Sequence, residues 1–348
     1  MHIGFVTSQY CPHTGGVETH VEQLATRLVD RGHTVTVIAS DAASGLAETT
    51  VRDGVFVRRF TPVGPTDAFH LAVGIAPLVR RSEFDIVHAH NYHSFPFALG
   101  TLGSRVPVVC TPHYHGGSAD SLRDRLLSLY RPVGRVVFGK AAAVVAVSTW
   151  ERDQLAADFD VGSTVIPNGI DVDRFQSVTP VDNTDPTLLT VGRLVEYKGV
   201  QHVIRALIDL PEYRLRVAGD GPYRDALEAC ARAEGVDDRV EFLGYVPDSE
   251  LAQQYASANV FVSMSSVEAA GITVGEALAA GTPAVVRPSK GLRDWARRDD
   301  CVSADPASLA DAVGRAQPLS APNEPLPTWD QAVDDLEFIY QNAVESAD

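Results

Sequence analysis

Short apolar runs alternate with amphipathic runs along almost the whole chain, and this alternation constrains the fold more than any other feature. Buried parallel strands read as near-continuous apolar runs, and helices that cover a sheet carry one apolar stripe, so the pattern indicates an α/β fold. In the first half, strands are predicted at residues 3–7, 34–39, 55–60, 86–89, 106–111 and 143–147. A helix is predicted over residues 17–31, where an apolar stripe ends at Gly32.

A second series of strands follows a Pro- and Asp-rich stretch, residues 167–186, whose composition is typical of a linker. Its strands are predicted at residues 188–191, 215–218, 240–243, 260–263 and 283–286. Further helices are predicted over residues 308–315 and, at the end of the chain, 329–345. The chain therefore contains two α/β units in tandem.

Composition and charge exclude several classes of protein. A chain of 348 residues can bury two cores of ordinary size. The net charge of −16 argues against nucleic-acid binding through a positive field, and it is also typical of acidic proteomes adapted to high salt. The four cysteines form no C-x-x-C pair, which favours a reducing, cytoplasmic setting. No apolar run approaches the roughly 20 residues of a membrane span, so we expect a soluble or at most peripheral protein.

Loops that follow the strands carry the candidate binding residues, because ligands of open parallel sheets bind beyond the carboxyl ends of the strands. Gly15 and Gly16 open the first long helix, where backbone N–H groups and the helix dipole favour a phosphate. A plain tight turn explains a lone glycine pair equally well. After another strand, Arg193 and Lys198 stand five residues apart. Arg193 can grip phosphate oxygens with its planar guanidinium, and Lys198 adds a mobile point charge.

Two carboxylates, Glu268 and Glu276, are spaced to accept hydrogen bonds from sugar hydroxyls. Glu268 lies in a predicted loop, and Glu276 lies in an Ala-rich helical stretch that reads as buried. A buried carboxylate needs a partner, which a ligand hydroxyl can supply. The alternative is that Glu268 merely stabilises the helix start and that Glu276 is a surface residue.

Histidines cluster after two strands of the first unit. Five of the eleven are His88, His90, His93, His113 and His115. His88 and His90 are two residues apart at a strand end, and so are His113 and His115. Side chains two apart on a strand point to the same face of the sheet, so the two members of each pair should lie on one face. A zinc site is conceivable, but no metal-binding spacing is present, so contacts to a polar ligand are favoured over a metal.

Taken together, the motifs resemble those of glycosyltransferase family 4. They are GGVE at 15–18, TPHYH at 111–115, VSTWERDQL at 147–155, IPNGID at 166–171, GRLVEYKG at 192–199, AGDGPY at 218–223, FLGYV at 242–246 and E-x7-E at 268–276. The opening segment looks particularly like the catalytic subunit of phosphatidylinositol N-acetylglucosaminyltransferase and its prokaryotic relatives. The pattern departs from the family after Val286, where only Gly291 and Asp294 are of similar type to the usual residues.

The resemblance implies a GT-B fold, in which two Rossmann-like domains face each other across a cleft. The acceptor-side domain would be residues 1–175, completed by residues 328–348, and the nucleotide-sugar-binding domain would be residues 176–327. Members transfer a sugar from a nucleotide-diphosphate donor with retention at the anomeric carbon. Members of this kind need no metal or other cofactor.

The resemblance also assigns roles at the matching positions. Arg193 and Lys198 would hold the diphosphate, Glu276 the ribose and Glu268 the donor sugar, while His113 would contact the sugar and the reacting region. The implied catalytic residues are thus His113, Glu268, Arg193 and Lys198. The remaining donor-binding positions are Gly15, Gly16, Gly271, Ile272, Thr273 and Glu276.

The sequence says less about the acceptor substrate than about the donor. From the resemblance we expect a lipid-linked or cell-envelope glycan. Residues 122–140 are locally basic and apolar in an acidic chain, with cations at Arg123, Arg125, Arg131, Arg135 and Lys140. Such a segment fits either an anionic membrane at the cytoplasmic face or the packing of an ordinary amphipathic helix. Two other functions use the same kind of site: a GT-B epimerase or phosphorylase, and a noncatalytic sugar-nucleotide-binding subunit.

Overall fold

The chain forms two compact units, each built on one sheet. The first contains Met1–Asn168 and Trp329–Asp348, and the second contains Gly169–Thr328. The sequence-based boundary at 175/176 lies inside helix α6, Val172–Gln176. The computed structural model describes all residues except 43–44, 64–69, 117–120, 182–183 and 348, and it does not describe the side chains of residues 121–129.

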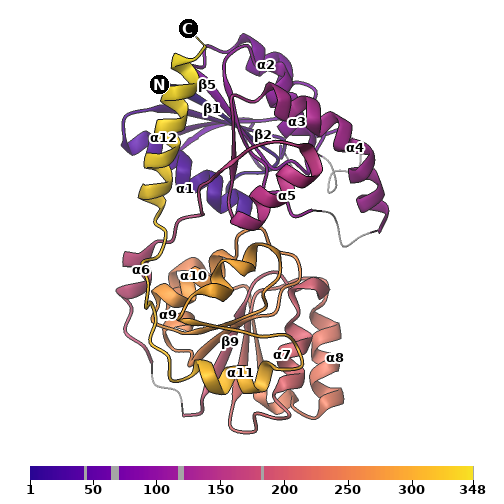
Figure 1. Ribbon diagram of the computed structural model, residues 1–348, viewed down its shortest axis with the longest axis vertical. Helices are drawn as coiled ribbons and strands as arrows, with labels where there is room; N and C mark the ends of the chain where they lie inside the picture. The colour runs from indigo at the N-terminus through magenta and orange to yellow at the C-terminus, as the bar shows by residue number, and fades with distance from the viewer. Residues whose placement is uncertain (43–44, 64–69, 117–120, 182–183, 348) are drawn as a thin grey trace. The chain divides into compact units, whose positions relative to one another are not determined.

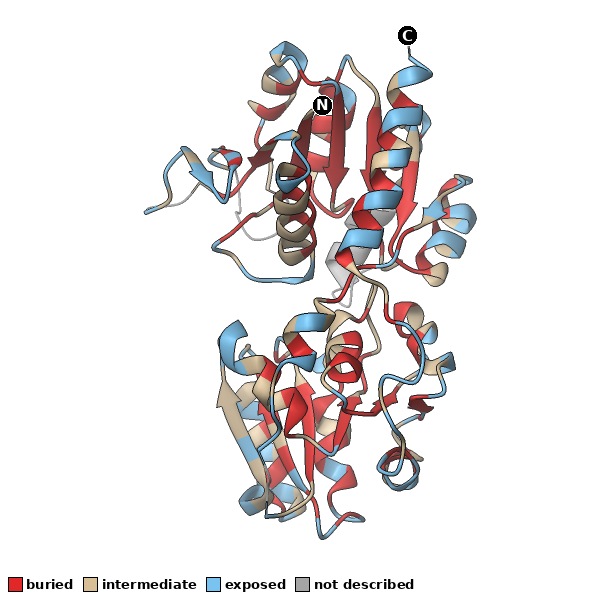
Figure 2. Ribbon diagram, turned by 90° about the vertical axis from the view of Figure 1, so that its left-hand side faces the viewer, coloured by how far each residue is buried: buried red, intermediate tan, exposed pale blue. Residues whose placement is uncertain are grey.

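The sheet of the first unit has the order β3-β4-β2-β1-β5-β6-β7-β8 (Figure 1). Its strands are β1 His2–Thr7, β2 Thr34–Ala39, β3 Thr49–Arg52, β4 Val55–Arg59, β5 Ile86–His90, β6 Val108–Thr111, β7 Ala143–Ala146 and β8 Thr164–Val165. Every pairing is parallel except that of β3 with β4. All residues of β5 and β6 are buried because helices cover both faces (Figure 2).

Helices on the two faces of this sheet belong to two separate hydrophobic clusters. α1 Gly16–Asp30 and α12 Trp329–Glu345 cover one face. The other face is covered by α2 Ile75–Arg81, α3 Phe95–Gly103, α4 Ser121–Lys140 and α5 Thr149–Phe159. Arg31 links α1 to α12 through ion pairs with Asp334 and Glu337. The last helix of the chain is therefore an integral part of the first unit.

The sheet of the second unit is parallel and has the order β11-β10-β9-β12-β13-β14. Its strands are β9 Thr187–Val191, β10 Arg214–Ala218, β11 Val240–Gly244, β12 Val260–Ser263, β13 Ala284–Val286 and β14 Cys301–Ser303. α7 Val200–Ala206, α8 Arg224–Glu234 and α11 Leu309–Ala316 pack on one face. α6, α9 Asp248–Ala256 and α10 Ile272–Ala279 pack on the other.

The predicted α/β class and the predicted long strands are confirmed, with shifts of one or two residues at their ends. The sequence did not predict β3, which has only four residues, three of them exposed, and pairs antiparallel at the sheet edge. It also did not predict α6, which lies in the stretch interpreted as a linker. No helix among the described residues is long and apolar enough to cross a bilayer.

A buried ion pair fixes the loop that follows β1. Asp41, just beyond β2, lies 2.5 Å from Arg59 at the end of β4, and both side chains are almost fully buried. Asp41 also accepts a hydrogen bond from the backbone of Tyr10, and Arg59 donates one to the carbonyl oxygen of Cys11. This network therefore holds the segment that leads into Gly15 and Gly16.

We predict that Arg59→Ala lowers the free energy of unfolding of the first unit by about 3–5 kcal/mol, because it leaves Asp41 buried without its partner. The matched control is Arg152→Ala, since Arg152 pairs with Asp153 on the exposed surface and should cost less than about 1 kcal/mol. Urea unfolding followed by circular dichroism measures both. Equal, small losses in the two variants would show that the buried pair does not stabilise the unit.

Candidate functional site

Two glycine-rich loops of the second unit pack against each other at the carboxyl ends of β9 and β10. A Cβ atom on Gly219 would lie 2.0 Å from the carbonyl oxygen of Gly192, and one on Gly221 would lie 2.3 Å from that of Leu194. Gly192 and Gly219 also have φ angles of 144° and 128°, which side-chain-bearing residues rarely adopt. This packing fixes the backbone that presents Arg193, whose own side chain is exposed.

Lys198 and Glu268 form an ion pair of 2.5 Å between the loop after β9 and the loop after β12. Burial lowers the pKa of Lys198, but the charge and hydrogen bond of Glu268 outweigh it, and the net pKa is raised. Gly199, with φ 75°, allows this loop to approach the end of β12, since a Cβ there would lie 2.4 Å from the carbonyl oxygen of Met264. Two of the predicted functional residues are thus brought into direct contact.

A small pocket connects these loops to the start of α10. Its lining includes Gly192, Arg193, Lys198, Ser263 and Thr273. Gly271 begins α10 with φ 70°, and no side chain caps the helix. The first-turn N–H groups near Ile272 and Thr273 therefore add a partial positive charge beside two cations, which is the electrostatic arrangement of an anion site.

Glu276 lies one turn further along α10 and accepts a hydrogen bond of 2.7 Å from the Tyr255 hydroxyl. Burial raises the pKa of Glu276, although the Tyr255 hydrogen bond and the charge of Arg174 act in the opposite direction. The carboxylate is therefore partnered within the protein, and Tyr255 is a positioning residue that the sequence analysis missed. Its sequence signal is weak, because a tyrosine in α9 has the ordinary appearance of a core residue.

The segment after Val286, where the sequence departs from the family pattern, braces the Glu268 loop. The backbone N–H of Gly291 donates to the carbonyl oxygen of Glu268, and a Cβ on Gly291 would lie 1.9 Å from that of Ala269. Trp295 donates through Nε1 to the carbonyl oxygen of Ala270 at 2.6 Å. Gly291 was noted in the sequence, whereas the contribution of Trp295 was not foreseen.

In the first unit, the glycine pair lies at the start of α1 as predicted. The Glu18 side chain lies close to Gly15: a Cβ on Gly15 would lie 2.3 Å from the Oε2 atom of Glu18. A Cβ on Gly16, by contrast, would have no neighbour within 4 Å among the described residues. The protein's own packing thus does not require glycine at position 16, and no side chain caps α1.

Three buried histidines meet beneath this helix start. His20 comes from α1, His90 from the end of β5 and His113 from the loop after β6, with ring centroids 4.7–5.9 Å apart. One nitrogen from each ring lies within 4.8 Å of the others, so this trio is the group of described residues that could hold a metal ion. His20 Nδ1 lies 2.8 Å from Asn168 Oδ1. An amide oxygen can only accept, so His20 Nδ1 carries the proton and the lone pair of the neutral His20 ring is on its Nε2 atom.

The two predicted histidine pairs behave differently. His88 and His90 do project to one face, with ring centroids 4.0 Å apart. His113 and His115 do not, and here the prediction is wrong. His113 lies beyond the strand with φ 49°, which turns the backbone, so the His115 ring instead stacks on His93 at 3.9 Å. Strand alternation does not extend past Thr111, the last residue of β6.

Glu151 ties the His113 loop to the start of α5. Its carboxylate accepts backbone hydrogen bonds from Tyr114 and Val147, while Ser148 caps the same helix. Burial raises the pKa of Glu151 to about 7, although the two backbone hydrogen bonds act to lower it. This residue belongs to the VSTWERDQL motif, and the structure gives that motif a positioning role.

The fold, with its two Rossmann-like parallel-sheet units, is of the GT-B class found in glycosyltransferases. A family model for "Glycosyltransferase Family 4" matches residues 14–174, and one for "Glycosyl transferases group 1" matches residues 171–317. Together the two models span residues 14–317, and both describe glycosyltransferases, which supports the resemblance to glycosyltransferase family 4.

Known relatives match over most of their own length. The phosphatidyl-myo-inositol mannosyltransferase of Mycobacterium tuberculosis is 29% identical over 90% of this chain and 85% of its own. One component of the phosphatidylinositol N-acetylglucosaminyltransferase of Arabidopsis thaliana is 27% identical over 98% and 81%. Among solved structures, Anabaena HepE in complex with UDP-glucose has a TM-score of 0.71 at 19% identity, covering 100% of this chain and 99% of its own.

We predict that acid destabilises the first unit through its histidine cluster. Burial holds the pKa of His88, His90 and His113 well below 6.5 and lowers that of His20 to about 4. The unfolded chain therefore binds more protons than the folded chain once the pH falls below about 6.5, and stability is lost in that direction. Each histidine contributes a slope of up to about 1.4 kcal/mol per pH unit.

The test compares the wild type with His90→Phe by urea unfolding at about pH 7.5 and about pH 5.5. The variant should lose less stability on acidification, because one buried group no longer competes for protons. Glu151 acts in the opposite direction, because its raised pKa adds stability at low pH that is lost as the pH rises toward 7. Both proteins contain Glu151, so its effect cancels in the comparison. Identical acid slopes would contradict the prediction.

Proposed function

We propose that this protein is a retaining glycosyltransferase that moves a sugar from a nucleotide-diphosphate donor to a lipid-linked or cell-envelope glycan. The observation that carries the proposal is the pocket of the second unit, where Arg193 and Lys198 lie with the uncapped start of α10. The Lys198–Glu268 pair adds a carboxylate at the same loops. Cations next to a carboxylate suit a sugar diphosphate better than either a free sugar or a free phosphate.

The cations act on the leaving group. Departure of a nucleoside diphosphate places negative charge on the β-phosphate oxygen, and donors fixed in advance stabilise that charge as it develops. The exposed guanidinium of Arg193 offers planar, two-point contact with phosphate oxygens, and Lys198 adds a point charge. The N–H groups at Ile272 and Thr273 contribute from the helix end. These groups stabilise the charge of the leaving phosphate, which a metal ion does in other transferases, so the proposed reaction needs no metal.

The carboxylates orient the donor rather than attack it. In the proposed roles, Glu268 accepts hydrogen bonds from the sugar, and Glu276, held by Tyr255, accepts them from the ribose. We assign no protein nucleophile. Retention then requires attack from the side of the leaving group, with the departing phosphate oxygen taking the proton of the acceptor hydroxyl as the new glycosidic bond forms. HepE, whose fold is similar, was solved with UDP-glucose, which supports a nucleotide sugar as the donor class.

The first unit supplies the acceptor side and His113. Open space at Gly16 would let the backbone of the α1 start approach a ligand closely. Two relatives are named for transfer to phosphatidylinositol-type lipids, which supports a lipid-linked acceptor. The proposed place of work is the cytoplasmic face of the membrane. The predicted basic segment falls partly on Arg123 and Arg125, whose side chains lie outside the described residues, while Arg131 pairs with Asp158.

Product analysis separates this proposal from the two alternatives. Incubation with UDP-, GDP- and ADP-sugars, first in a thermal-shift panel, identifies the donor because a ligand that binds the native state raises its melting temperature. A transferase then releases nucleoside diphosphate when an acceptor is present, or slowly when it transfers the sugar to water. An epimerase changes the sugar without an acceptor, a phosphorylase requires free phosphate, and a noncatalytic subunit binds the nucleotide with no turnover.

We predict that Arg193→Ala, Lys198→Ala and Glu276→Ala each weaken nucleotide-sugar binding by roughly tenfold or more, because each removes a charge-assisted contact. Isothermal titration with the donor identified above measures the change. Arg232→Ala, on the exposed surface of α8, is the matched control and should bind as the wild type does. Undiminished affinity in the three site variants would remove the site assignment.

Gly16→Ala separates ligand contact from folding. The added methyl group meets nothing in the described protein, and alanine favours a helix start, so the melting temperature should stay the same or rise slightly. Transfer should nevertheless fall by roughly tenfold or more if substrate approaches this backbone. Gly139→Ala, which also meets nothing, is the control and should keep full activity. Full activity in Gly16→Ala would exclude close ligand approach at this position.

A further inference from the structure

The histidine trio of the first unit, His20, His90 and His113, holds buried ring nitrogens that have no hydrogen-bond partner among the described residues. These atoms are Nε2 of His20, Nε2 of His113 and both ring nitrogens of His90. Burying a polar group without a partner is unfavourable. The trio therefore needs a partner other than the described protein groups.

His88, on the same strand as His90, shows how a histidine of this core is satisfied by the protein itself. Its Nδ1 atom lies 2.6 Å from the Tyr340 hydroxyl, and its Nε2 atom lies 2.7 Å from Thr111 Oγ1. The His88 ring is buried as completely as that of His90. Burial alone therefore does not explain the unpartnered nitrogens of the trio.

The nitrogens of the trio converge on one point. One nitrogen from each ring lies within 4.8 Å of the others. Nitrogens bound to one tetrahedral zinc ion, with bonds of about 2.0–2.1 Å, are about 3.4 Å apart, so these three must approach one another by at most about 1.4 Å. An outer shell is also present, because Asn168 Oδ1 accepts a hydrogen bond from His20 Nδ1 at 2.8 Å and leaves the lone pair on Nε2.

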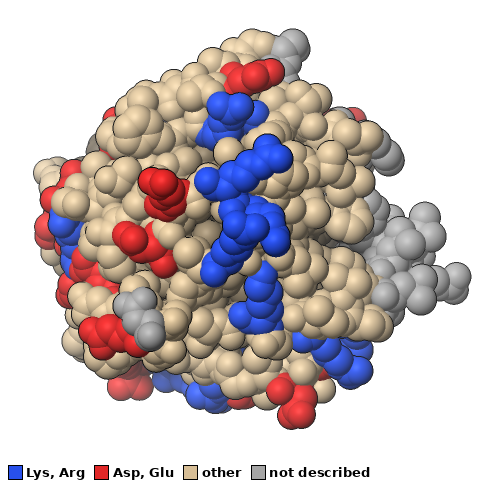
Figure 3. Space-filling model, turned by 90° about the horizontal axis from the view of Figure 1, so that it is seen from above, with Lys and Arg blue, Asp and Glu red and all other residues tan. Residues whose placement is uncertain are grey.

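The donor set selects the kind of cation. Imidazole nitrogens suit Zn²⁺ and similar transition metals, whereas Mg²⁺ and Ca²⁺ prefer oxygen ligands. Three protein ligands also leave the fourth position of a tetrahedral ion open to water or substrate. The row of Lys and Arg side chains in Figure 3 crosses the other end of the first unit, where Arg80 and Arg81 end α2, so its positive charge does not oppose a cation at the trio.

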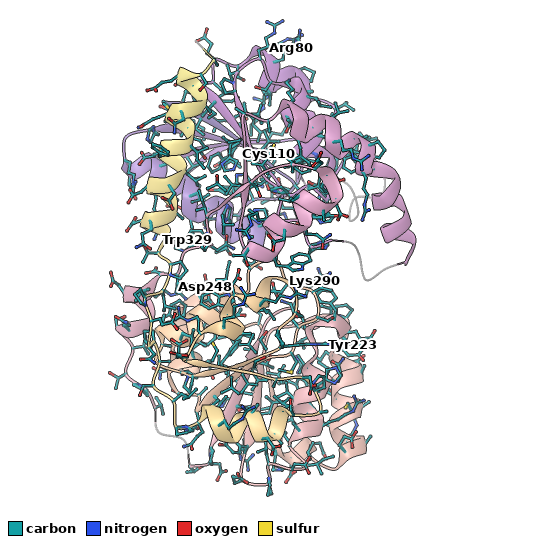
Figure 4. The ribbon with its side chains drawn as sticks, in the orientation of Figure 1. Arg80, Cys110, Tyr223, Asp248, Lys290 and Trp329 are labelled. Carbon is teal, nitrogen blue, oxygen red and sulfur yellow. The ribbon has the colours of Figure 1, made fainter. Side chains whose placement is uncertain are left out.

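A small ion can reach the trio beside the start of α1. Gly16 is exposed and precedes His20 by four residues, which is about one helical turn. A Cβ on Gly16 would have no described neighbour within 4 Å, so space is open there. The Trp329 ring bounds the trio on another side, with its centroid 5.8 Å from that of His20, and Figure 4 labels Trp329 where α12 begins.

We propose that the histidine trio binds Zn²⁺ and that the bound ion inhibits the sugar transfer proposed above. Coordination would occupy the lone pair of His113, the residue that is proposed to contact the sugar and the reacting region. The inhibition therefore rests on the proposed function, whereas the binding does not. Because the ion acts as an inhibitor and not as a cofactor, the proposal agrees with a reaction that needs no metal.

The sequence analysis favoured a polar ligand over a metal at these histidines because no metal-binding spacing was present. The structure shows why spacing could not reveal the set. Its members come from α1, from the end of β5 and from the loop after β6, and His20 was not among the histidines that the sequence grouped together.

Isothermal titration of the metal-free full chain with ZnCl₂ measures binding. His20→Phe and His90→Phe each remove one of three ligands and should weaken Zn²⁺ binding by roughly a hundredfold or more, and Asn168→Ala should weaken it by roughly tenfold. His115→Ala is the matched control, because His115 follows the same strand but lies outside the trio, and it should bind Zn²⁺ as the wild type does. Titration with MgCl₂ should show no binding.

A second measurement needs no variant and so does not depend on how well a variant folds. Co²⁺ absorbs visible light strongly in a four-coordinate site and weakly in water. We expect the strong absorption when Co²⁺ is added to the wild type, and its loss when Zn²⁺ is added afterwards. Circular dichroism checks that each variant used in the titration is folded.

The inhibition is measured by sugar transfer at increasing Zn²⁺ concentration. The wild type and His115→Ala should be inhibited alike, and Asn168→Ala should need roughly tenfold more Zn²⁺. Equal Zn²⁺ affinity in the trio variants and the wild type, loss of binding only in His115→Ala, or a Co²⁺ spectrum like that in buffer would overturn the site. Full transfer activity with Zn²⁺ bound would overturn the inhibition. Failure of the proposed function appears as absence of transfer without Zn²⁺, and the titration is then still interpretable.

Discussion

Close backbone packing between the loops after β9 and β10 is the constraint on which the proposed donor-binding end of the second unit depends. Gly219 and Gly221 leave no room for side chains against the backbone of Gly192 and Leu194, so the two loops form one rigid edge. From this edge Arg193 reaches solvent, and Lys198 meets Glu268. A flexible loop could carry the same charges, but it would have to be ordered each time a diphosphate bound, at a cost in conformational entropy.

The Lys198–Glu268 pair makes that edge stable before any ligand arrives. Two charges of opposite sign satisfy each other, and Gly291 and Trp295 fix the backbone of the Glu268 loop from behind. A sugar diphosphate would offer phosphate oxygens to the lysine and hydroxyl groups to the carboxylate, so both partners exchange one contact for another. Binding of this kind leaves neither charge unpaired, and an unpaired charge in a partly buried site is unfavourable in free energy.

Sequence patterns predicted the parts of this protein that local chemistry controls. The apolar runs of β1, β5 and β9 and the stripe of α1 sufficed to give two parallel sheets, because burial on both faces dictates the residue types. The partners of Glu276 and His20 were not predictable in this way. Tyr255 and Asn168 are distant from them in the sequence, and only tertiary packing decides which polar atoms meet. His113 shows a third limit, since one residue at positive φ redirected the pair that strand alternation implied.

The first unit separates two kinds of polar chemistry on opposite edges of one sheet. At the carboxyl ends of the strands, burial keeps the His20, His90 and His113 rings neutral, so they present lone pairs and N–H groups rather than charge. At the amino ends, Arg80, Arg81 and Arg105 remain exposed and charged. Opposite edges of a parallel sheet collect different loops, and each set of loops can change without disturbing the other.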